Sequence, residues 1–294
     1  MSRCKAFSGR HEDMESFIEA IEKRVSVRTY TEQAVEEEQR QQILSLLSAN
    51  NTGLFGNVIR FELINFSEME RGEVRKLGTY GFIKGAKMYI VCATKGGPGA
   101  MEDVGFCFEK IILGAINLGL GTCWLGGTFR RAGFARRLGI SDDEVVPVIS
   151  PLGYAHRKRR LSESVLRHFV KSDRRKPWEE LFFDVNIKTP LTRDNSGKYI
   201  APLECVRLGP SASNKQPWRI IRQRDPAIFR FYLRRNKGYG MAYEGVDLQR
   251  IDMGIALCHF ELAARETGIT GNWEVEEPDI HPGKLQYILS WRGT

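Results

Sequence analysis

Two arginines and a serine near the N-terminus have the types and the spacing to bind a phosphate group. Arg24, Ser26 and Arg28 alternate in the run Arg-Val-Ser-Val-Arg. In extended backbone, alternate side chains lie on the same face. Two guanidinium groups beside a hydroxyl group could then hold phosphate oxygens through charge-assisted hydrogen bonds. The pattern also fits a solvent-exposed edge after a helix, and short charge patterns are weak signals on their own.

A second polar stretch lies far downstream, at 209–218. Its sequence is Gly-Pro-Ser-Ala-Ser-Asn-Lys-Gln-Pro-Trp, and the strand-like run 219–222 follows. The two prolines restrict the backbone, and the serine and asparagine side chains can bond to neighbouring backbone or to a ligand. We therefore predict a rigid polar loop that leads into a strand. An ordinary connecting loop has the same composition, so this stretch alone leaves both interpretations open.

Glycines follow the first of two long apolar segments. Residues 101–118 predict a buried helix, and 119–127 continue as Gly-Leu-Gly-Thr-Cys-Trp-Leu-Gly-Gly. Glycine permits positive φ and lets the backbone approach a flat ligand closely. The glycines of this segment are therefore candidates for such a contact. The segment does not follow a strand in the G-x-G-x-x-G pattern, which argues against a Rossmann dinucleotide site.

Composition indicates a protein of the reducing cytoplasm with one large core or two smaller ones. The chain has 294 residues and 42% hydrophobic content. No apolar run is long enough to span a membrane, and the N-terminus lacks the apolar core of a signal peptide. The six cysteines form no CxxC or metal-binding pattern. Cys92, Cys107 and Cys258 lie in apolar runs, which favours buried free thiols.

The net charge of +8 raises the question of nucleic-acid binding. No nucleic-acid-binding motif accompanies the basic runs 157–160 and 174–176, and no aromatic residues are interleaved with them. These runs fit solvated surface or anion sites, and we expect a small phosphate-bearing ligand rather than nucleic acid. The histidines form no motif. His259 lies inside a long predicted helix, which favours a core or interface role over catalysis.

The elements that position these residues follow from periodicity and from turn residues. Helices are predicted over 14–24, 35–49, 68–77, 101–118, 131–139, 157–171, 176–183, 200–208, 225–235 and 243–267. Strands are predicted over 58–66, 87–93, 144–152, 218–223 and 284–291. The candidate residues therefore fall at the ends of elements, where binding residues commonly lie.

The order of these elements occurs twice along the chain. The two long predicted helices align without a gap and match Asp103 with Asp252, Gly105 with Gly254, Gly119 with Gly268 and Trp124 with Trp273. We predict a divergent duplication, with one half at 14–172 and the other at 173–294. Two similar halves can pack about a pseudo-twofold axis, as the subunits of a homodimer do.

The two halves also differ. The run 48–60 aligns with 210–222, but at 48–56 it has lost the marker residues of the downstream loop. The second half shows no clear match to the predicted strand 87–93. The sequence therefore predicts two related halves with specialised roles.

Together these motifs resemble the nitroreductase family of FMN flavoproteins over about 14–294. The resemblance rests on Arg-x-Ser-x-Arg near the N-terminus, Pro-Ser-x-x-Asn-x-Gln-Pro-Trp before a strand, a long helix ending in Gly-Leu-Gly-Thr-Cys-Trp-Leu-Gly-Gly, and a strand ending in Leu-Gly-Tyr. Two unequal halves in one chain resemble a less common, single-chain branch of the family. The resemblance implies an α+β, nitroreductase-like three-layer α/β/α fold, with two similar halves packed as an intramolecular pseudo-dimer.

The resemblance also implies where FMN binds. FMN lies at the dimer interface in typical members, which implies a site shared by the two halves of this chain. The implied FMN-binding residues are Arg24, Ser26, Arg28, Leu125, Gly126, Gly127, Lys158, Arg160, Pro210, Ser211, Ala212 and Asn214. We expect one FMN per chain, because the second copy of the site would pair 174–178 with 48–52, where neither motif survives.

The activity that the resemblance implies is that of an FMN-dependent oxidoreductase. NAD(P)H would reduce FMN, and electrons would then pass to a nitroaromatic, quinone or similar small-molecule acceptor in a two-step ping-pong mechanism. The chemistry would take place on FMN, without a side-chain nucleophile or a metal. Phe82, Lys84 and 236–243 are candidate walls of the acceptor pocket or plain surface loops. We expect a monomer with neither nucleic-acid nor membrane partners. The alternatives are an FMN-binding protein without catalytic activity and a nucleic-acid-binding protein.

Overall fold

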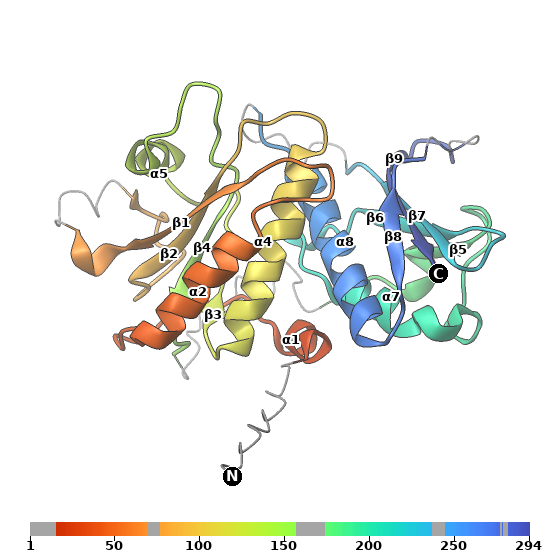
Figure 1. Cartoon of the computed structure of the whole chain (residues 1–294), viewed down its shortest axis with the longest axis horizontal. Helices are drawn as coiled ribbons and strands as arrows, with labels where there is room; N and C mark the ends of the chain where they lie inside the picture. Colours follow the sequence, from red (N-terminus) through yellow and green to blue (C-terminus); the bar gives the residue numbers. More distant parts are fainter. Residues whose placement is uncertain (1–15, 70–76, 157–173, 237–244, 277, 279–281) are drawn as a thin grey trace, which may run out of the picture.

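Two β-sheets lie on either side of a central pair of long helices in the computed structural model (Figure 1). The structure describes residues 16–69, 77–156, 174–236, 245–276, 278 and 282–294. Most of the helix predicted over 68–77, the whole helix predicted over 157–171 and the loop residues 237–243 lie outside the described residues. The combination of helices with largely antiparallel sheets confirms the α+β fold.

The first sheet has four strands in the order β1-β2-β4-β3. They span Arg60–Asn65 (β1), Met88–Ala93 (β2), Gly121–Thr122 (β3) and Ile149–Gly153 (β4). All pairings between them are antiparallel. Every residue of β2 is buried, as its continuous apolar run predicts. The strands predicted over 58–66 and 87–93 are confirmed, whereas the strand predicted over 144–152 begins later.

The second sheet has five strands in the order β5-β6-β7-β9-β8. They span Phe182–Asp184 (β5), Trp218–Arg222 (β6), Ile228–Leu233 (β7), Gly271–Glu274 (β8) and Gln286–Gly293 (β9). The antiparallel pairings of β6, β7, β9 and β8 repeat those of β1, β2, β4 and β3. Strand β5 lies outside this correspondence and pairs with β6 in parallel.

Strand β7 replaces the helix that the sequence predicts over 225–235. Asp225 begins a turn: its side chain accepts a hydrogen bond from the Ala227 N–H at 3.0 Å, and its carbonyl oxygen accepts one from the Ile228 N–H at 3.1 Å. The run Ile-Phe-Arg-Phe-Tyr-Leu then favours a strand, because β-branched and aromatic side chains fit a pleated sheet. Strand β7 is the counterpart of β2, for which the sequence shows no clear match.

The segment between the two sheets also differs from its prediction. A 3-10 turn over Trp178–Glu180 (η3) replaces the helix predicted over 176–183, and β5 follows it. A longer 3-10 segment, Asp194–Tyr199 (η4), lies within a predicted loop. The Trp178 indole N–H donates to the carbonyl oxygen of Leu191 at 2.7 Å. This bond holds the chain after β5 against η3.

The helices of the described residues lie close to their predicted positions. They span Phe17–Lys23 (α1), Glu37–Ala49 (α2), Ala100–Asn117 (α4), Arg131–Leu138 (α5), Ile200–Leu208 (α7) and Leu248–Glu266 (α8). Short 3-10 turns span Phe66–Glu68 (η1) and Ala212–Asn214 (η5). Helices α4 and α8 are buried along most of their length and pack against each other. This helix pair lies between the two sheets, and both sheets pack against it.

Two bulk predictions can be compared with the structure. Cys92, Cys107 and Cys258 are buried free thiols, as predicted, and so are Cys123 and Cys205. Within the described parts of the chain, none of the helices has the length and apolar character needed to cross a membrane.

Candidate functional site

The Arg24–Arg28 segment is extended, as the sequence predicts. Helix α1 begins at its N-cap Ser16, whose side chain accepts the Glu19 N–H, and ends at Lys23. The chain then runs beside β3: Ser26 forms a parallel bridge with Thr122, and the Val27 N–H donates to the Thr122 carbonyl oxygen at 2.8 Å. The predicted phosphate-binding residues therefore lie next to the glycine-containing segment that follows α4.

The side chains of this segment are suited to an anion. Burial lowers the pKa of the Arg24 guanidinium, Glu109 opposes that shift, and the nearby charge of Arg28 adds to it. The Arg24 Nε is enclosed and has no hydrogen-bond partner among the described residues. Within the same residues, Arg28 has no carboxylate in ion-pair contact. Two neighbouring cations therefore have no ion-paired carboxylate among these residues, which leaves positive charge for a ligand.

Glu109 connects this segment with the second half of the chain. One of its carboxylate oxygens accepts the Trp124 indole N–H at 2.6 Å, and the other lies 2.9 Å from Nε2 of His259. The second ring nitrogen of His259 lies 2.8 Å from the carbonyl oxygen of Cys205 on α7. Both Glu109 and His259 are fully buried. His259 is therefore a buried core residue, in agreement with its predicted core or interface role.

The loop before β6 is held by its own side chains. The Ser211 hydroxyl accepts the Gln216 N–H at 2.9 Å. The Asn214 side chain donates to the Arg174 carbonyl oxygen at 2.7 Å and accepts from the Gln216 amide at 3.0 Å. Ser213, Asn214 and Gln216 have φ values of 47°, 54° and 48°. Left-handed backbone at three non-glycine positions is strained, and such strain is common in binding loops.

The same bonds locate the basic run 174–176. Besides the Arg174–Asn214 bond, the Lys176 N–H donates to the Gln216 side chain at 2.8 Å, and Arg175 donates to the Leu208 carbonyl oxygen at 2.9 Å. This run therefore lies against the loop of its own half. Asn214, predicted to contact a ligand, uses its side chain to fix the loop.

Helix α8 brings the loop and the glycine segment together. The Ala212 N–H donates to the Asp252 side chain at 2.9 Å. Gly126 lies against Leu248, so that a methyl group added to Gly126 would be 2.6 Å from a Leu248 methyl carbon. Leu248 and Asp252 are four residues apart, and such pairs are neighbours on one helical face. The two predicted parts of the site thus meet at the first turns of α8.

The glycine segment is anchored at Leu125 and Gly126 and has open space beside Gly127. Leu125 is buried and exchanges two backbone hydrogen bonds of 3.0 Å with Ile149. The Gly126 carbonyl oxygen accepts from the Arg131 guanidinium at 2.8 Å. A methyl group added to Gly127 would meet no atom within 4 Å. The backbone at Gly127 therefore has open space beside it.

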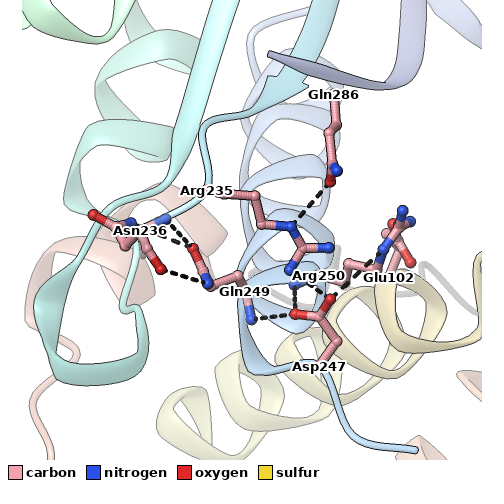
Figure 2. A network of polar contacts seen from close by, with 7 residues as sticks. All are labelled: Glu102, Arg235, Asn236, Asp247, Gln249, Arg250 and Gln286. Atoms are coloured by element: carbon pink, nitrogen blue, oxygen red, sulfur yellow. Dashed lines mark hydrogen bonds and ion pairs between the residues drawn. The ribbon is translucent and has the colours of Figure 1, made fainter. Parts of the chain in front are cut away.

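A polar network fixes the start of α8 (Figure 2). Asp247 caps the helix by accepting the N–H groups of Gln249 and Arg250 at 3.1 and 3.3 Å. Arg235 pairs with Asp247 at 2.5 Å, and Arg250 pairs with the buried Glu102 of α4. Because Leu248 lies inside this capped turn, the network also sets the position of the residue that contacts Gly126.

Other predicted residues have mixed outcomes. Lys158 and Arg160 lie outside the described residues. Lys84 lies beside Arg28, whose carbonyl oxygen accepts the Lys84 N–H at 2.9 Å. Phe82 is exposed nearby in the same loop. Sequence reasoning missed Glu109, Asp252 and Leu248, and only Asp252 carried a signal, through its match with Asp103.

Comparisons with known proteins extend over the whole chain. A model of the family described as “Putative TM nitroreductase” matches residues 16–264. A crystal structure described as a “putative nitroreductase” from Thermotoga maritima is 20% identical, with 98% of this chain and 99% of that chain covered and a TM-score of 0.60. At this identity the similarity concerns the fold.

Shorter proteins match about half of this chain. An FMN-dependent nitroreductase from Clostridium difficile is 21% identical, with 49% of this chain and 92% of that chain covered and a TM-score of 0.39. The NADPH:FMN oxidoreductase from Vibrio harveyi is 22% identical, with 51% of this chain and 75% of that chain covered and a TM-score of 0.40. None of the curated proteins matches the sequence significantly.

Proposed function

The chain belongs to the family described as “Putative TM nitroreductase”, and from this membership we propose that it is an FMN-dependent oxidoreductase. FMN would bind once per chain, between the Arg24–Arg28 segment and the loop 210–214. The observation that best supports this site is that Gly126 and Ala212, from the two halves, lie against neighbouring turns of α8.

The residues of the site fit the two ends of FMN. At the phosphate end, the enclosed Arg24 Nε lacks a partner among the described residues, and Arg28 faces no carboxylate there. A phosphate dianion would compensate both charges. At the ring end, the open space beside Gly127 permits a flat group to approach the backbone. Lys158 and Arg160 remain proposed phosphate contacts.

Bound FMN would supply hydride and electron transfer, and the residues of this chain would orient and tune it. Arg24 and Ser26 would hold the phosphate and the ribityl chain. The backbone of Gly126 and Gly127 would lie along the ring edge. The Arg28 guanidinium would share the phosphate contact with Arg24. NAD(P)H would be the reductant, and a nitroaromatic, quinone or similar small molecule the acceptor, in two half-reactions that share one site.

We also propose that the two halves, 14–172 and 173–294, form an intramolecular pseudo-dimer and that the chain acts as a monomer in the cytoplasm. Two observations support this. The second sheet repeats the strand pairings of the first. Asp103 accepts the N–H groups of Phe55 and Asn57 in the first half, as the matching Asp252 accepts the Ala212 N–H in the second.

The experiment is a flavin assay of the purified protein. The flavin-to-protein ratio should be one after saturation with FMN, and a ratio of two would contradict the single site. Anaerobic mixing with NADH or NADPH should bleach the flavin absorbance. Flavin that binds without bleaching would instead favour a non-catalytic FMN-binding protein. Failure to bind FMN would contradict both the oxidoreductase and the FMN-binding protein.

Three variants test the split site. Arg24→Ala and Arg28→Ala should each weaken FMN binding by about tenfold or more, because a charged hydrogen bond to phosphate is lost. Asn214→Ala should weaken it through the loop conformation. Lys188→Ala is the matched control, since Lys188 is exposed in the second half and distant in sequence from both segments. Unchanged FMN affinity in both Arg24→Ala and Asn214→Ala would refute the split site.

A further inference from the structure

Four basic residues lie in or next to the loop 209–217, in the second half of the chain. We call Lys176, Lys215, Arg219 and Arg234 the basic cluster. Backbone and side-chain bonds bring their segments together at Gln216 and Pro217. The Lys176 N–H donates to the Gln216 side chain at 2.8 Å, and an Arg219 guanidinium nitrogen donates to the Gln216 carbonyl oxygen at 3.1 Å. The Arg234 N–H donates to the Pro217 carbonyl oxygen at 2.8 Å.

Arg219 is the buried member of the basic cluster. It lies in β6, opposite Tyr232 of β7, and only 1% of its surface is exposed. One guanidinium nitrogen reaches the carbonyl oxygens of Gln216 and Trp218, while Nε is enclosed and has no partner in the described chain. A buried guanidinium that meets carbonyl dipoles but no carboxylate is incompletely compensated.

The other members add charge of the same sign. Burial, followed by the charge of Arg219, lowers the pKa of Lys176 to about 8, and Arg234 and Lys215 contribute further. Burial and the charge of Arg234 lower the pKa of Arg219 to about 10. Glu180 is the carboxylate that opposes both shifts. No carboxylate of the described residues forms an ion pair with Lys176 or Arg234.

We propose that the basic cluster is a binding site for a phosphate-like dianion. The guanidinium of Arg219 would form its base, and the ammonium group of Lys176 and the exposed guanidinium of Arg234 would close over the anion from the rim. Its positive charge comes from the second half, whereas the proposed flavin site draws its positive charge from Arg24 and Arg28 of the first half. It goes beyond the proposed oxidoreductase activity and does not depend on it.

The first test is sulfate binding to the full-length protein, as isolated with any flavin it carries. Sulfate should bind wild-type protein at pH 7, measured by isothermal titration calorimetry. Lys176→Met and Arg234→Met should each weaken binding by about tenfold, because each removes one charged contact. Lys188→Met, at an exposed lysine outside the basic cluster, is the control and should bind as wild type does. The test avoids replacing Arg219, because it is buried in the sheet.

The pH dependence gives a second signature. Sulfate keeps its charge between pH 7 and pH 9, whereas Lys176 loses its proton over this range. Arg219, with its pKa of about 10, keeps its proton over most of this range. Binding should therefore weaken towards pH 9 in wild-type protein, and Lys176→Met should remove most of this dependence. The charged groups that shift the pKa of Lys176 are Arg219, Arg234, Lys215 and Glu180.

Two further ligands identify the source of the anion. Tighter binding of inorganic phosphate than of adenosine 2′,5′-bisphosphate would point to free phosphate. The reverse order, with the advantage lost in Lys176→Met, would point to the phosphoryl group of a nucleotide. Absence of sulfate binding in wild type, or equal affinity in wild type, Lys176→Met and Arg234→Met, would overturn the proposal. Arg28→Ala should lower flavin content and leave sulfate binding unchanged, which separates this site from the flavin site.

Discussion

Gly105 of α4 and Gly254 of α8 lie against each other where the two long helices cross. A methyl group added to Gly105 would be 3.0 Å from the Gly254 Cα and 2.0 Å from the Ile251 carbonyl oxygen. One added to Gly254 would be 1.9 Å from the Glu102 carbonyl oxygen. Each glycine thus faces the carbonyl group three residues before the other glycine. The contact is reciprocal, as the proposed pseudo-twofold relation requires.

Alanine at either glycine should destabilise the protein. Gly105→Ala and Gly254→Ala would force the helices apart against backbone atoms that cannot rotate away, at about 1–3 kcal/mol or more each. Gly114→Ala on α4 is the control, because its methyl group would meet the end of the Leu46 side chain, which can turn aside. Urea denaturation gives the free energies. Equal losses of unfolding free energy in all three variants would show that the helices do not need glycine at their crossing.

The pair of Glu102 and Arg250 provides a second prediction. Glu102 is buried, and burial raises its pKa while Arg250 lowers it (Figure 2). Arg250→Met should destabilise the protein at pH 7 by about 2–3 kcal/mol, less than a fully buried pair because Arg250 is partly exposed. Adding Glu102→Gln should restore part of this loss. Lys23→Met, which breaks an exposed pair with Glu19, should leave stability nearly unchanged.

Urea denaturation at pH 7 and pH 5 measures the stability of the Arg250→Met variant with and without Glu102→Gln. The Arg250→Met loss should shrink towards pH 5, because the unpaired Glu102 carboxyl gains a proton more readily in the folded state. A loss that is the same at both pH values, and that Glu102→Gln does not relieve, would mean that Arg250 acts through packing alone.

Asp252 gives a pH-dependent prediction. Burial raises its pKa well above the usual range, against the opposing hydrogen bond from the Ala212 N–H. One of its oxygens is enclosed without a partner among the described residues. A raised pKa in the folded state adds stability below the unfolded value and loses it as pH rises through the folded value. As pH rises towards 8, Asp252 ionises more readily in the unfolded chain than in the folded protein, so this carboxyl lowers the stability of wild type.

Asp252→Asn should consequently be more stable than wild type at pH 8 by about 1–2 kcal/mol, with no difference near pH 3. Asp103→Asn is the matched comparison at the equivalent position. Both Asp103 oxygens accept N–H groups, from Phe55 and from Asn57, so the amide should lose a hydrogen bond and destabilise. Thermal denaturation against pH measures both. A gain for Asp252→Asn that persists at pH 3 would contradict the role of the charge.

Most elements of the fold could be predicted because their patterns are local. The apolar helices and the buried strand β2 carry periodic or continuous apolar runs. Strand β7 could not be placed, since Asp-Pro at 225–226 serves a helix start and a turn equally well, and only its pairing with β6 and β9 decides. The ungapped alignment also failed there, because the first half has a longer connection between its corresponding strands.

The part of the site that lies within recognisable motifs could be predicted from the sequence. Arg24, Gly126 and Ala212 belong to recognisable runs, and the structure brings the segments of Gly126 and Ala212 to one helix. The residues that hold these segments could not be inferred. Glu109 and Leu248 lie in apolar helices where nothing in the sequence distinguishes a core position from a supporting one. The motif predicts a ligand contact for Asn214 but does not reveal that its side chain also fixes the loop.

The contact between Glu109 and His259 supports a final prediction. The Cys205 carbonyl oxygen can only accept, so Nδ1 of His259 must carry a proton. The Trp124 indole N–H occupies one Glu109 oxygen. The remaining contact, between Nε2 of His259 and the other Glu109 oxygen, therefore needs one proton that the two groups share.

Glu109→Gln would satisfy the same three contacts, because its amide group can donate to Nε2 of His259 while its oxygen accepts from Trp124. We expect it to fold with a loss below about 1 kcal/mol. Glu109→Leu has similar size but would leave two buried polar groups without partners, at about 1–3 kcal/mol each. Urea denaturation of the two variants separates the cases. Equal stability of Glu109→Gln and Glu109→Leu would mean that Glu109 contributes by filling space, and that the halves are not joined by this hydrogen-bonded pair.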